Sequence, residues 1–417
     1  MRILKAIGSM LLFFGCVCLV HQTGASAQSS TAFHQIRIVD GSFFPKESAS
    51  VQAFDISPDG LLLAVLFQST SARDSWLRVV VEDVATGRTR MDVALNVEGI
   101  RPEIHNFPWY EPHLEFSADQ RFLIVQDWQM IRVVDIADSK VVRTFTSTND
   151  QLSFPLSIHS ASSNDLVLVS YGTKVPFIWG NKGFNDLVNP QRVHNELVDI
   201  STGQRQSSWD SLDIPQSLSA DGKLAAVSEW EGSTPLVEVE IVDAQNGQKL
   251  KTLNSGFKFK KPWAPGPAGR VIGKFLSDDE ILLSPDEHVD STGHRSGDAF
   301  RIVRVSDGQL VREIRPQGFG PAGEIAVSAD RHCFAALNWY ISPGAAKRDA
   351  APSEPPSLII FPDPAKALSY TVPLTQPGNN SGLDTNEWLD SWRPRIANNA
   401  AAVAIVRDRG VIVFQRN

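Results

Sequence analysis

Residues 51–87 read VQAFDISPDGLLLAVLFQSTSARDSWLRVVVEDVATG, and this stretch decides the fold. It holds two turn sequences, Ser57-Pro58-Asp59-Gly60 and Asp83-Val84-Ala85-Thr86-Gly87, each after a run containing apolar and β-branched residues. Pro, Asp and Gly at such positions favour tight turns, and the runs between them favour short β-strands. The stretch therefore predicts strands a and b around the first turn, a variable connection, and strands c and d around the second turn.

Both turn sequences recur along the chain. The first returns as Ser117-Ala118-Asp119-Gln120, Ser219-Ala220-Asp221-Gly222 and Ser328-Ala329-Asp330-Arg331, with degenerate copies at residues 158–165, 276–279 and 396–399. The second returns at residues 133–139, 197–203, 241–247 and 303–308. The serines that mark the first six copies are 43 to 60 residues apart, and they are Ser57, Ser117, Ser160, Ser219, Ser277 and Ser328.

Four-stranded units at this spacing, without helical periodicity between them, are typical of β-propeller blades. Seven copies predict an all-β, seven-bladed propeller of antiparallel blades, and six or eight blades stay open because three copies are degenerate. The paired turns resemble those of bacterial YVTN and WD-repeat-like propellers, akin to TolB-type repeats, over residues 50–417. The resemblance implies a fold rather than an activity, because these propellers host unrelated functions.

The two ends of the repeat region complement each other. After the last turn copy only residues 401–406 and 410–415 remain as strands, so the last blade lacks a fourth strand. Residues 34–40 (HQIRIVD) form a predicted strand without a blade of its own. Pairing it with residues 410–415 removes two exposed strand edges at once. We therefore predict that the N-terminal strand closes the ring.

Residues 1–27 have the three parts of a secretory signal: Arg2 and Lys5, an apolar run over residues 6–20, and the site Ala25-Ser26-Ala27. The run is shorter than the roughly 20 residues that span a bilayer, which favours cleavage near Ala27 over a membrane anchor. A lipoprotein signal at Cys16 is disfavoured because Phe13 stands where Leu is usual. We expect a secreted or periplasmic protein with a single propeller domain over residues 28–417.

Composition and motifs exclude several functions. A formal net charge of −8 in 417 residues argues against nucleic-acid binding, which needs a basic footprint. No further apolar run reaches membrane-spanning length. The Gly-rich residues 318–323 contain Pro321 and precede a strand-like run, and the His and Asp residues of 286–298 fit no calcium loop. No nucleophile elbow, metalloprotease helix or P-loop occurs, so we expect no catalytic residue, metal or cofactor.

Two functions from different classes stay open. As a rigid binding module or scaffold, the propeller would hold a protein, peptide or glycan. As an enzyme or enzyme subunit, lactonase-like or oxidoreductase-associated, it would carry charged groups from four or more blades in the central channel. Strand a offers polar residues that are scattered in the sequence, which favours the binding module; they are Asp55, His113, Glu115, His159 and Arg395.

Aromatic residues suggest which face binds. The a–b and c–d turns are short and polar, whereas the b–c and d–a connections carry the tryptophans. Trp128, Trp230, Trp339 and Tyr171 each lie eleven residues after a marking serine, which is typical of wedges between blades. The irregular aromatics on d–a connections are the predicted recognition residues, since binding energy concentrates on tryptophan and tyrosine. They are Trp109, Tyr110, Trp209, Trp263, Trp388 and Trp392.

Overall fold

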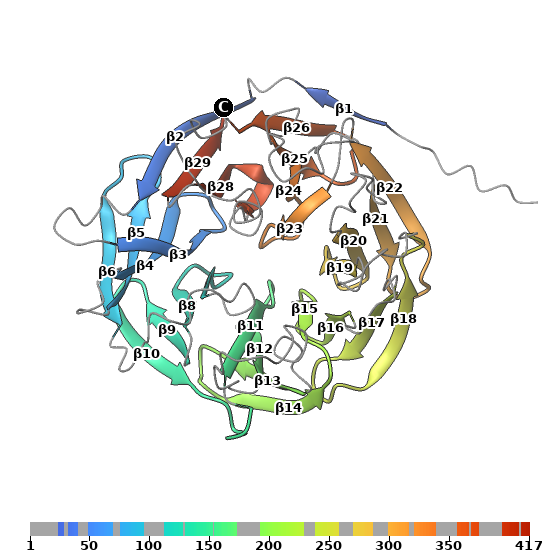
Figure 1. Ribbon diagram of the computed structural model, residues 1–417, viewed down its shortest axis with the longest axis horizontal. Coiled ribbons are helices and arrows are strands. Elements are labelled where there is room, and N and C mark those ends of the chain that lie inside the picture. The colour runs from blue at the N-terminus through green and yellow to red at the C-terminus, as the bar shows by residue number, and fades with distance from the viewer. Residues whose placement is uncertain are drawn as a thin grey trace, which may run out of the picture.

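The computed structural model is a disc in which seven four-stranded antiparallel sheets, the blades, stand around a central axis (Figure 1). Strand a of each blade is innermost and strand d lies at the rim. The predicted seven-bladed β-propeller is confirmed, and the alternatives of six or eight blades are wrong. The structure describes residues 24–28, 32–40, 49–69, 76–95, 112–127, 130–152, 154–172, 192–228, 238–257, 270–286, 299–316, 321–338, 357–366, 368–374, 394–407 and 410–417.

The strands follow the chain blade by blade. Blade 1 is β3 (Ala49–Ile56), β4 (Leu62–Ser69), β5 (Leu77–Asp83) and β6 (Thr89–Leu95), and blade 2 is β7 (His113–Phe116), β8 (Phe122–Gln126), β9 (Ile131–Asp135) and β10 (Lys140–Phe145). Blade 3 is β11 (Phe154–Ser160), β12 (Leu166–Gly172), β13 (Val193–Asp199) and β14 (Arg205–Ser211), and blade 4 is β15 (Pro215–Leu218), β16 (Leu224–Val227), β17 (Glu238–Asp243) and β18 (Lys249–Asn254). Blade 5 is β19 (Arg270–Phe275), β20 (Glu280–Asp286), β21 (Phe300–Arg304) and β22 (Leu310–Pro316), and blade 6 is β23 (Pro321–Val327), β24 (Phe334–Asn338), β25 (Ser357–Asp363) and β26 (Leu368–Pro373).

Blade 7 combines the two ends of the propeller. Its inner strands are β27 (Pro394–Ile396), β28 (Ala402–Arg407) and β29 (Gly410–Arg416), and its rim strand is β2 (Phe33–Asp40). β2 pairs antiparallel with β29, with Phe33 opposite Arg416 and Asp40 opposite Gly410. The predicted closure of the ring by the N-terminal strand is confirmed.

One strand lies outside the blades. β1 (Gly24–Gln28) pairs in parallel with two rim strands, Gly24 opposite Arg315 of β22 and Ser26 opposite Leu368 of β26. The cleavage predicted near Ala27 falls within this strand. Because the blades contain no residue before Phe33, such a cleavage leaves all seven blades with four strands.

The hydrophobic core lies between the blades rather than at the axis. Each of seven buried clusters joins two neighbouring blades, and together they close the ring. Between blades 1 and 2, for example, Leu66 and Val79 pack with Leu114 and Leu123. Every blade therefore depends on both neighbours for burial of its apolar faces, and the axis is left for polar side chains.

The Ser-x-Asp turn is held by its own side chains. Ser57 Oγ donates to Asp59 Oδ1 at 2.6 Å and accepts from the backbone N of Leu62 at 2.8 Å, while Asp59 Oδ1 accepts from the backbone N of Leu61 at 2.9 Å. The same three bonds form at the turns that begin at Ser117, Ser219 and Ser328. Because these serines are buried, the hydroxyl satisfies a backbone donor that water cannot reach.

The degenerate turns use other residues. In blade 3 the backbone N of Ala161 bonds to Leu166 O at 2.8 Å, as the N of Ser57 bonds to Leu62 O at 2.9 Å in blade 1. Ala161, and not Ser160, is therefore the equivalent of Ser57, so the eleven-residue spacing predicted for Tyr171 is wrong by one. Tyr171 itself lies on β12 and is fully buried, as expected of a wedge between blades.

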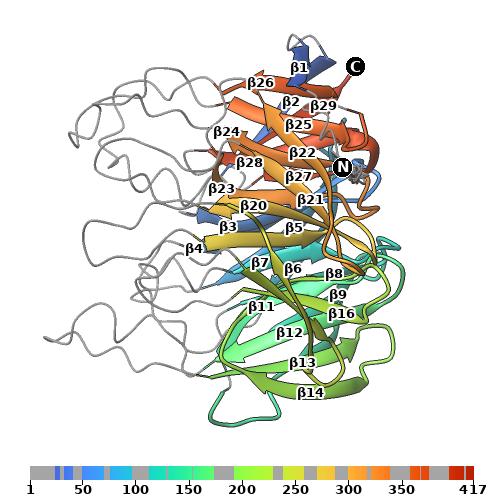
Figure 2. The ribbon, with the colours of Figure 1, turned by 90° about the vertical axis from the view of Figure 1, so that its right-hand side faces the viewer.

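The a–b and c–d turns gather on one side of the disc, the turn face, on the right in Figure 2. Neighbouring a–b turns are tied to each other by hydrogen bonds. Ser163 Oγ donates to Ala220 O at 2.7 Å, the backbone N of Asp221 to Asp278 Oδ1 at 2.9 Å, and the N of Asp330 to Asn398 Oδ1 at 2.9 Å. The turn face is thus closed by contacts among the blades themselves.

Candidate functional site

The opposite side of the disc is the loop face, where strands b and d end and strands c and a begin. The segments between these strand ends lie largely outside the described residues. They contain five of the six predicted recognition residues, Trp109, Tyr110, Trp263, Trp388 and Trp392, whose binding role stays a prediction. Trp128, Trp179, Trp230 and Trp339 also lie outside the described residues.

Trp209, the sixth predicted recognition residue, lies within the rim strand β14 and not on a d–a connection. It is 7% exposed and packs with Leu218 and Ala244 of blade 4. Its indole Nε1 donates to Ala244 O at 3.0 Å. A side chain so enclosed presents little surface to a partner, so the structure gives Trp209 a packing role between blades 3 and 4.

Other blades place a long side chain at the same location. Arg37 of blade 7 lies over Gly87 of blade 1, and Trp209 lies over Gly247 of blade 4. A Cβ at Gly247 would stand 2.5 Å from Trp209 Cε3, and the residue also has a φ of +70°. Glycine is therefore required there both by the turn and by the indole ring. A long side chain over the glycine of the neighbouring blade is therefore a structural contact between blades, whether Arg or Trp supplies it.

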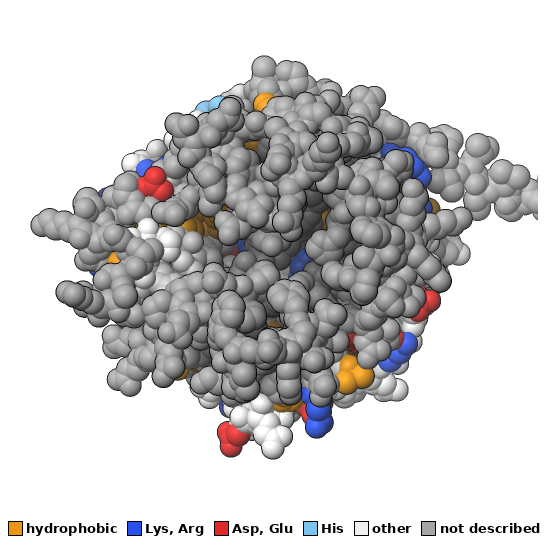
Figure 3. Space-filling model, viewed as in Figure 1, with side chains coloured by type: hydrophobic (Ala, Val, Ile, Leu, Met, Phe, Trp, Pro, Cys, Tyr) orange, Lys and Arg blue, Asp and Glu red, His pale blue; other side chains and the backbone are white. Residues whose placement is uncertain are grey.

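The inner strands share a polar position two residues before each a–b turn. We call it the channel position, and its residues in blades 1 to 7 are Asp55, Glu115, His159, Ser217, Lys274, Ala326 and Arg395. Their strands line the axis, where the space-filling view is hollowed and shows basic and acidic side chains (Figure 3). Six of the seven residues are polar, although a core strand would favour apolar side chains.

Several of these side chains bind the inner strand of the next blade. Asp55 Oδ2 accepts from the backbone N of Phe116 at 2.8 Å, and Glu115 Oε1 accepts from the N of Ser160 at 3.3 Å. His159 Nε2 lies 2.8 Å from Pro215 O, so this nitrogen carries the proton, because a carbonyl only accepts. The channel position therefore links blades 1 to 4 in sequence.

The ring continues through blades 4 and 5. Ser217 Oγ donates to Gly273 O at 2.9 Å, and Lys274 Nζ donates back to Gln216 O at 2.7 Å. Gln216 Oε1 accepts from the backbone N of Gly273 at 2.7 Å. These bonds place an ammonium group at the axis, on the opposite side of the ring from the carboxylates of blades 1 and 2.

The two carboxyl groups share one electrostatic environment. Burial raises the pKa of Asp55 to about 7, against the lowering effect of Arg395, whose Nε is 3.8 Å from Asp55 Oδ1. Burial also raises the pKa of Glu115, opposed by Ser160, Arg395 and Arg331. His113 Nε2 lies 3.8 Å from Glu115 Oε2, as expected from their alternation along one strand.

Arg331 crosses between blades at the end of the channel nearest the turn face. It occupies the fourth position of the blade 6 turn, with a φ of +65°, where Gly60 and Gly222 stand in other blades. Its guanidinium donates to Phe275 O of blade 5 at 2.9 Å and to Ser160 O of blade 3 at 3.1 Å. One side chain from blade 6 thereby ties two other blades together.

The polar residues of strand a lie far apart in the sequence, but the fold brings them together at the axis. The expectation that they do not cluster is therefore wrong. Asp55, Glu115, His159 and Arg395 come from four blades and line one ring, which Lys274 and Arg331 complete from two more. Sequence reasoning missed Lys274, Ser217 and Arg331. Lys274 and Ser217 could have been found from their position two residues before an a–b turn. For Arg331, the only signal was its place at the fourth position of a turn where other copies have glycine.

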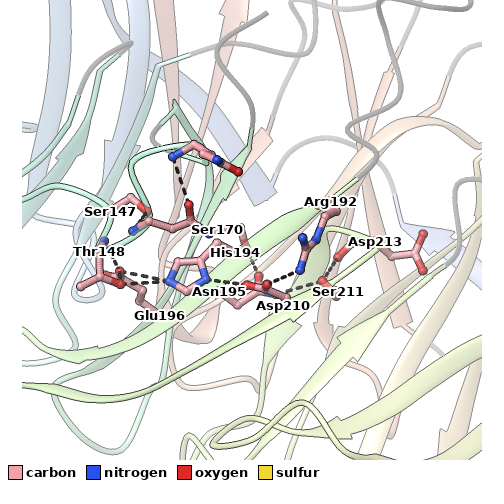
Figure 4. A network of polar contacts seen from close by, with 12 residues as sticks. Ser147, Thr148, Ser170, Arg192, His194, Asn195, Glu196, Asp210, Ser211 and Asp213 are labelled. Carbon is pink, nitrogen blue, oxygen red and sulfur yellow. Dashed lines mark hydrogen bonds and ion pairs between the residues drawn. The ribbon is translucent and has the colours of Figure 1, made fainter.

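A second polar network lies at the rim between blades 2 and 3 (Figure 4). Glu196 of β13 is fully buried, and its carboxylate accepts from Arg205 Nε at 2.8 Å and from Thr148 N at 2.7 Å and Oγ1 at 2.6 Å. His194 lies between Thr148 Oγ1 at 3.1 Å and Asp210 Oδ1 at 2.7 Å. These bonds fasten the d–a connection after β10 to the next blade.

This network has the order of a hydroxyl, an imidazole and a carboxylate found in hydrolytic sites. The Thr148 hydroxyl, however, donates its proton to Glu196 Oε1 and leaves His194 no proton to accept from it. The backbone N of Thr148 is bonded to the same carboxylate. The geometry therefore supports a structural clamp rather than a nucleophile.

Two kinds of feature are absent from the described part of the chain. No group of three or more His, Cys, Asp or Glu residues there is arranged to hold a metal ion. No helix among those residues is long and apolar enough to cross a membrane. Cys333 is buried, its Sγ lying 3.3 Å from Ala397 O of blade 7, and burial raises the pKa of the thiol to about 11.

Comparison with known proteins supports the fold. No protein-family model matches the sequence, and no curated protein matches it. A chain in the crystal structure of the mitotic checkpoint complex superposes with a TM-score of 0.51 at 12% identity, covering 94% of this chain and 97% of that one. Such a likeness at so low an identity concerns the fold alone. On this ground, and on its seven closed blades, the chain has the fold of a WD-repeat-like β-propeller.

Proposed function

We propose that this protein is an exported, rigid binding module that holds a protein, peptide or glycan partner at its loop face. The observation that carries the proposal is the difference between the two faces. The turn face consists of short turns that satisfy and tie one another. The loop face joins the same strands through segments that are mostly longer, and these segments contain nine of the ten tryptophans.

Rigidity supports this function because it lowers the entropy lost on binding. The apolar residues that stabilise the fold lie between the blades, in seven clusters that close on themselves. The connections at the loop face can therefore vary without loss of the core. Recognition residues placed there are held by a fixed frame, as loops on other rigid scaffolds are.

Five residues are proposed to supply the contacts: Trp109, Tyr110, Trp263, Trp388 and Trp392. We expect the variant Trp109→Ala/Trp263→Ala/Trp388→Ala to lose at least tenfold in partner affinity with a nearly unchanged melting temperature, because aromatic side chains dominate binding energy at interfaces. Partners are first identified by co-purification with the mature protein from the native exported fraction. Affinity is then measured with the purified partner, and stability by thermal unfolding.

A matched control removes exposed apolar area from the turn side of the disc. Leu61, Leu250 and Leu310 are 56%, 53% and 42% exposed, and their replacement by Ala is expected to leave partner affinity unchanged. Equal losses of affinity in both triple variants would contradict the assignment of the loop face. Unfolding of the tryptophan variant would instead place those residues in the core.

Export is the second part of the proposal, and it rests on the basic, apolar and small-residue segments of residues 1–27. We expect the mature chain to begin near Gln28. Mass determination of the N-terminal peptide from protein isolated from its native source tests this. A native protein that retains residues 1–27 would reject export by this signal.

The central channel supports a second candidate function, an enzyme or enzyme subunit with its site at the axis. The observation in its favour is the convergence of charged residues at the axis from blades 1, 2, 5, 6 and 7. Asp55, with a pKa of about 7, is matched to proton transfer near neutral pH. Turnover of a small molecule that stops in Asp55→Asn would support this candidate over the binding module.

A further inference from the structure

One rim strand lacks the usual protection of a sheet edge. Charged side chains on an edge strand discourage it from pairing with other chains. Among the seven rim strands that the structure describes, β2, β6, β10, β14, β18 and β22 each carry at least one charged residue. β26 reads Leu-Ser-Tyr-Thr-Val-Pro and carries none. Its β-branched and aromatic residues also favour strand pairing, so its edge is suited to accept a further strand.

β1 occupies this edge. Its residues 26–28 pair in parallel with residues 368–370 of β26, and its residues 24–25 pair in parallel with residues 315–316 at the end of β22. β1 thus lies between two blades and joins them into one nine-stranded sheet (Figure 1). Proline has no backbone N–H, so Pro316 ends the ladder on β22 at the point where β1 passes to β26.

The position between two edges limits what can occupy it. A strand inserted there uses both of its sides, one toward β22 and the other toward β26. The rim strand of a second copy has only one free side, because its other side is already paired within its own blade. A single extended segment has both sides free. The geometry therefore favours a peptide segment over a second propeller.

We propose that the edges of β26 and β22 form a strand-binding site of the mature protein, whose ligand is an extended, uncharged segment of a partner protein with small side chains. The inference rests on the proposed export, because cleavage near Ala27 removes residues 24–27 from the site. In the precursor β1 fills the site, and cleavage opens it. The site lies at the rim, apart from the aromatic residues proposed for the loop face.

The chemistry of the ligand follows from the segment that the site already holds. Residues 24–27 are Gly, Ala, Ser and Ala, and β26 offers no charged side chain to pair with a charged ligand. In strand addition, main-chain hydrogen bonds supply the affinity. A ligand therefore needs backbone N–H groups along the paired stretch, so proline there is excluded.

The test measures the binding of a fluorescein-labelled peptide of residues 22–28 (QTGASAQ) by fluorescence anisotropy. We expect it to bind the mature chain, residues 28–417, and to bind the complete chain at least about tenfold more weakly, because the tethered β1 competes at high effective concentration. Equal binding to both chains, or no binding to the mature chain, would overturn the proposal.

A second peptide tests whether the contact is strand pairing. The peptide variant Ser26→Pro/Ala27→Pro lacks two consecutive N–H groups, and successive N–H groups of a strand point to opposite sides. One of the two missing donors therefore faces β26 in any register. We expect this peptide not to bind the mature chain. Binding as tight as that of the unaltered peptide would refute strand addition.

A matched pair of protein variants locates the site. Leu368 and Leu310 each begin a rim strand, but only Leu368 lies opposite a residue of β1. Leu368→Lys places a charge on the β26 edge and should weaken peptide binding about tenfold, whereas Leu310→Lys should leave it unchanged. Equal effects would contradict a site on β26. Thermal unfolding checks that both variants fold; if Leu368→Lys does not, the proline peptide decides with the unaltered protein.

Two further outcomes separate this site from its alternatives. Sedimentation of the mature chain as a dimer that Leu368→Lys dissociates, without peptide binding, would assign the edge to a second copy and overturn the proposal. Retention of residues 1–27 in the native protein would overturn both the export and the open site. Absence of peptide binding to the chain 28–417 would overturn the site alone.

Discussion

Removal of residues 1–40 is expected to abolish cooperative unfolding, whereas removal of residues 1–31 leaves it intact. The two deletions differ only by residues 32–40, which contain the whole of β2. Without β2, blade 7 loses its rim strand and β29 becomes an exposed edge. Exposed edges pair with other chains, so the longer deletion should also aggregate. Urea unfolding followed by fluorescence, with sedimentation of the same samples, measures both effects.

The effect is large because β2 contributes to both interfaces of blade 7. Phe33 is buried in the cluster with blade 6, and Val39 in the cluster with blade 1. Burial of each such side chain stabilises the folded protein by about 1.5–3 kcal/mol. A ring that opens at one blade then also loses the mutual support of the others.

Addition of the missing strand in trans provides a specific control. A peptide of residues 32–40 should restore a sharp transition to the longer deletion, since β2 is held by antiparallel pairing along β29. A scrambled peptide should have no effect. A deletion of residues 1–40 that unfolds as sharply and at the same urea concentration as the complete protein would contradict closure by β2.

The second large effect is expected from Trp209→Ala, which should reduce the free energy of unfolding by about 3–5 kcal/mol. The indole is 7% exposed, fills the space between blades 3 and 4, and donates to Ala244 O. Its removal leaves a cavity beside Gly247, which has no side chain to fill it. Urea unfolding gives the difference in stability.

Two replacements make this prediction specific. Trp209→Phe keeps most of the apolar volume and should lose less stability than Trp209→Ala. Leu212→Ala, at a side chain 63% exposed just beyond β14, should change stability by no more than about 0.5 kcal/mol. If Trp209→Ala instead keeps its stability and loses the partner, Trp209 belongs to recognition after all.

The sequence by itself determined the fold, and the reason is that the repeat is local. A Ser-x-Asp turn needs only its own side chains, as the bonds among Ser57, Asp59 and Leu62 demonstrate. Each copy therefore marks one a–b hairpin wherever it stands. The number of turn copies predicted the number of blades. The absence of a fourth strand after residue 415 predicted closure by residues 34–40.

Other features were decided by tertiary structure alone. Whether Trp209 lies at a surface or between blades depends on Gly247, 38 residues further along the chain, and no local pattern reveals that contact. Ala161 takes the role of the turn serine in blade 3 because its backbone position, not its side chain, matches Ser57. Asp55 and Arg395 meet because the last blade returns to the first. The two residues are far apart in the sequence but close in space, because a closed ring places its first and last blades side by side.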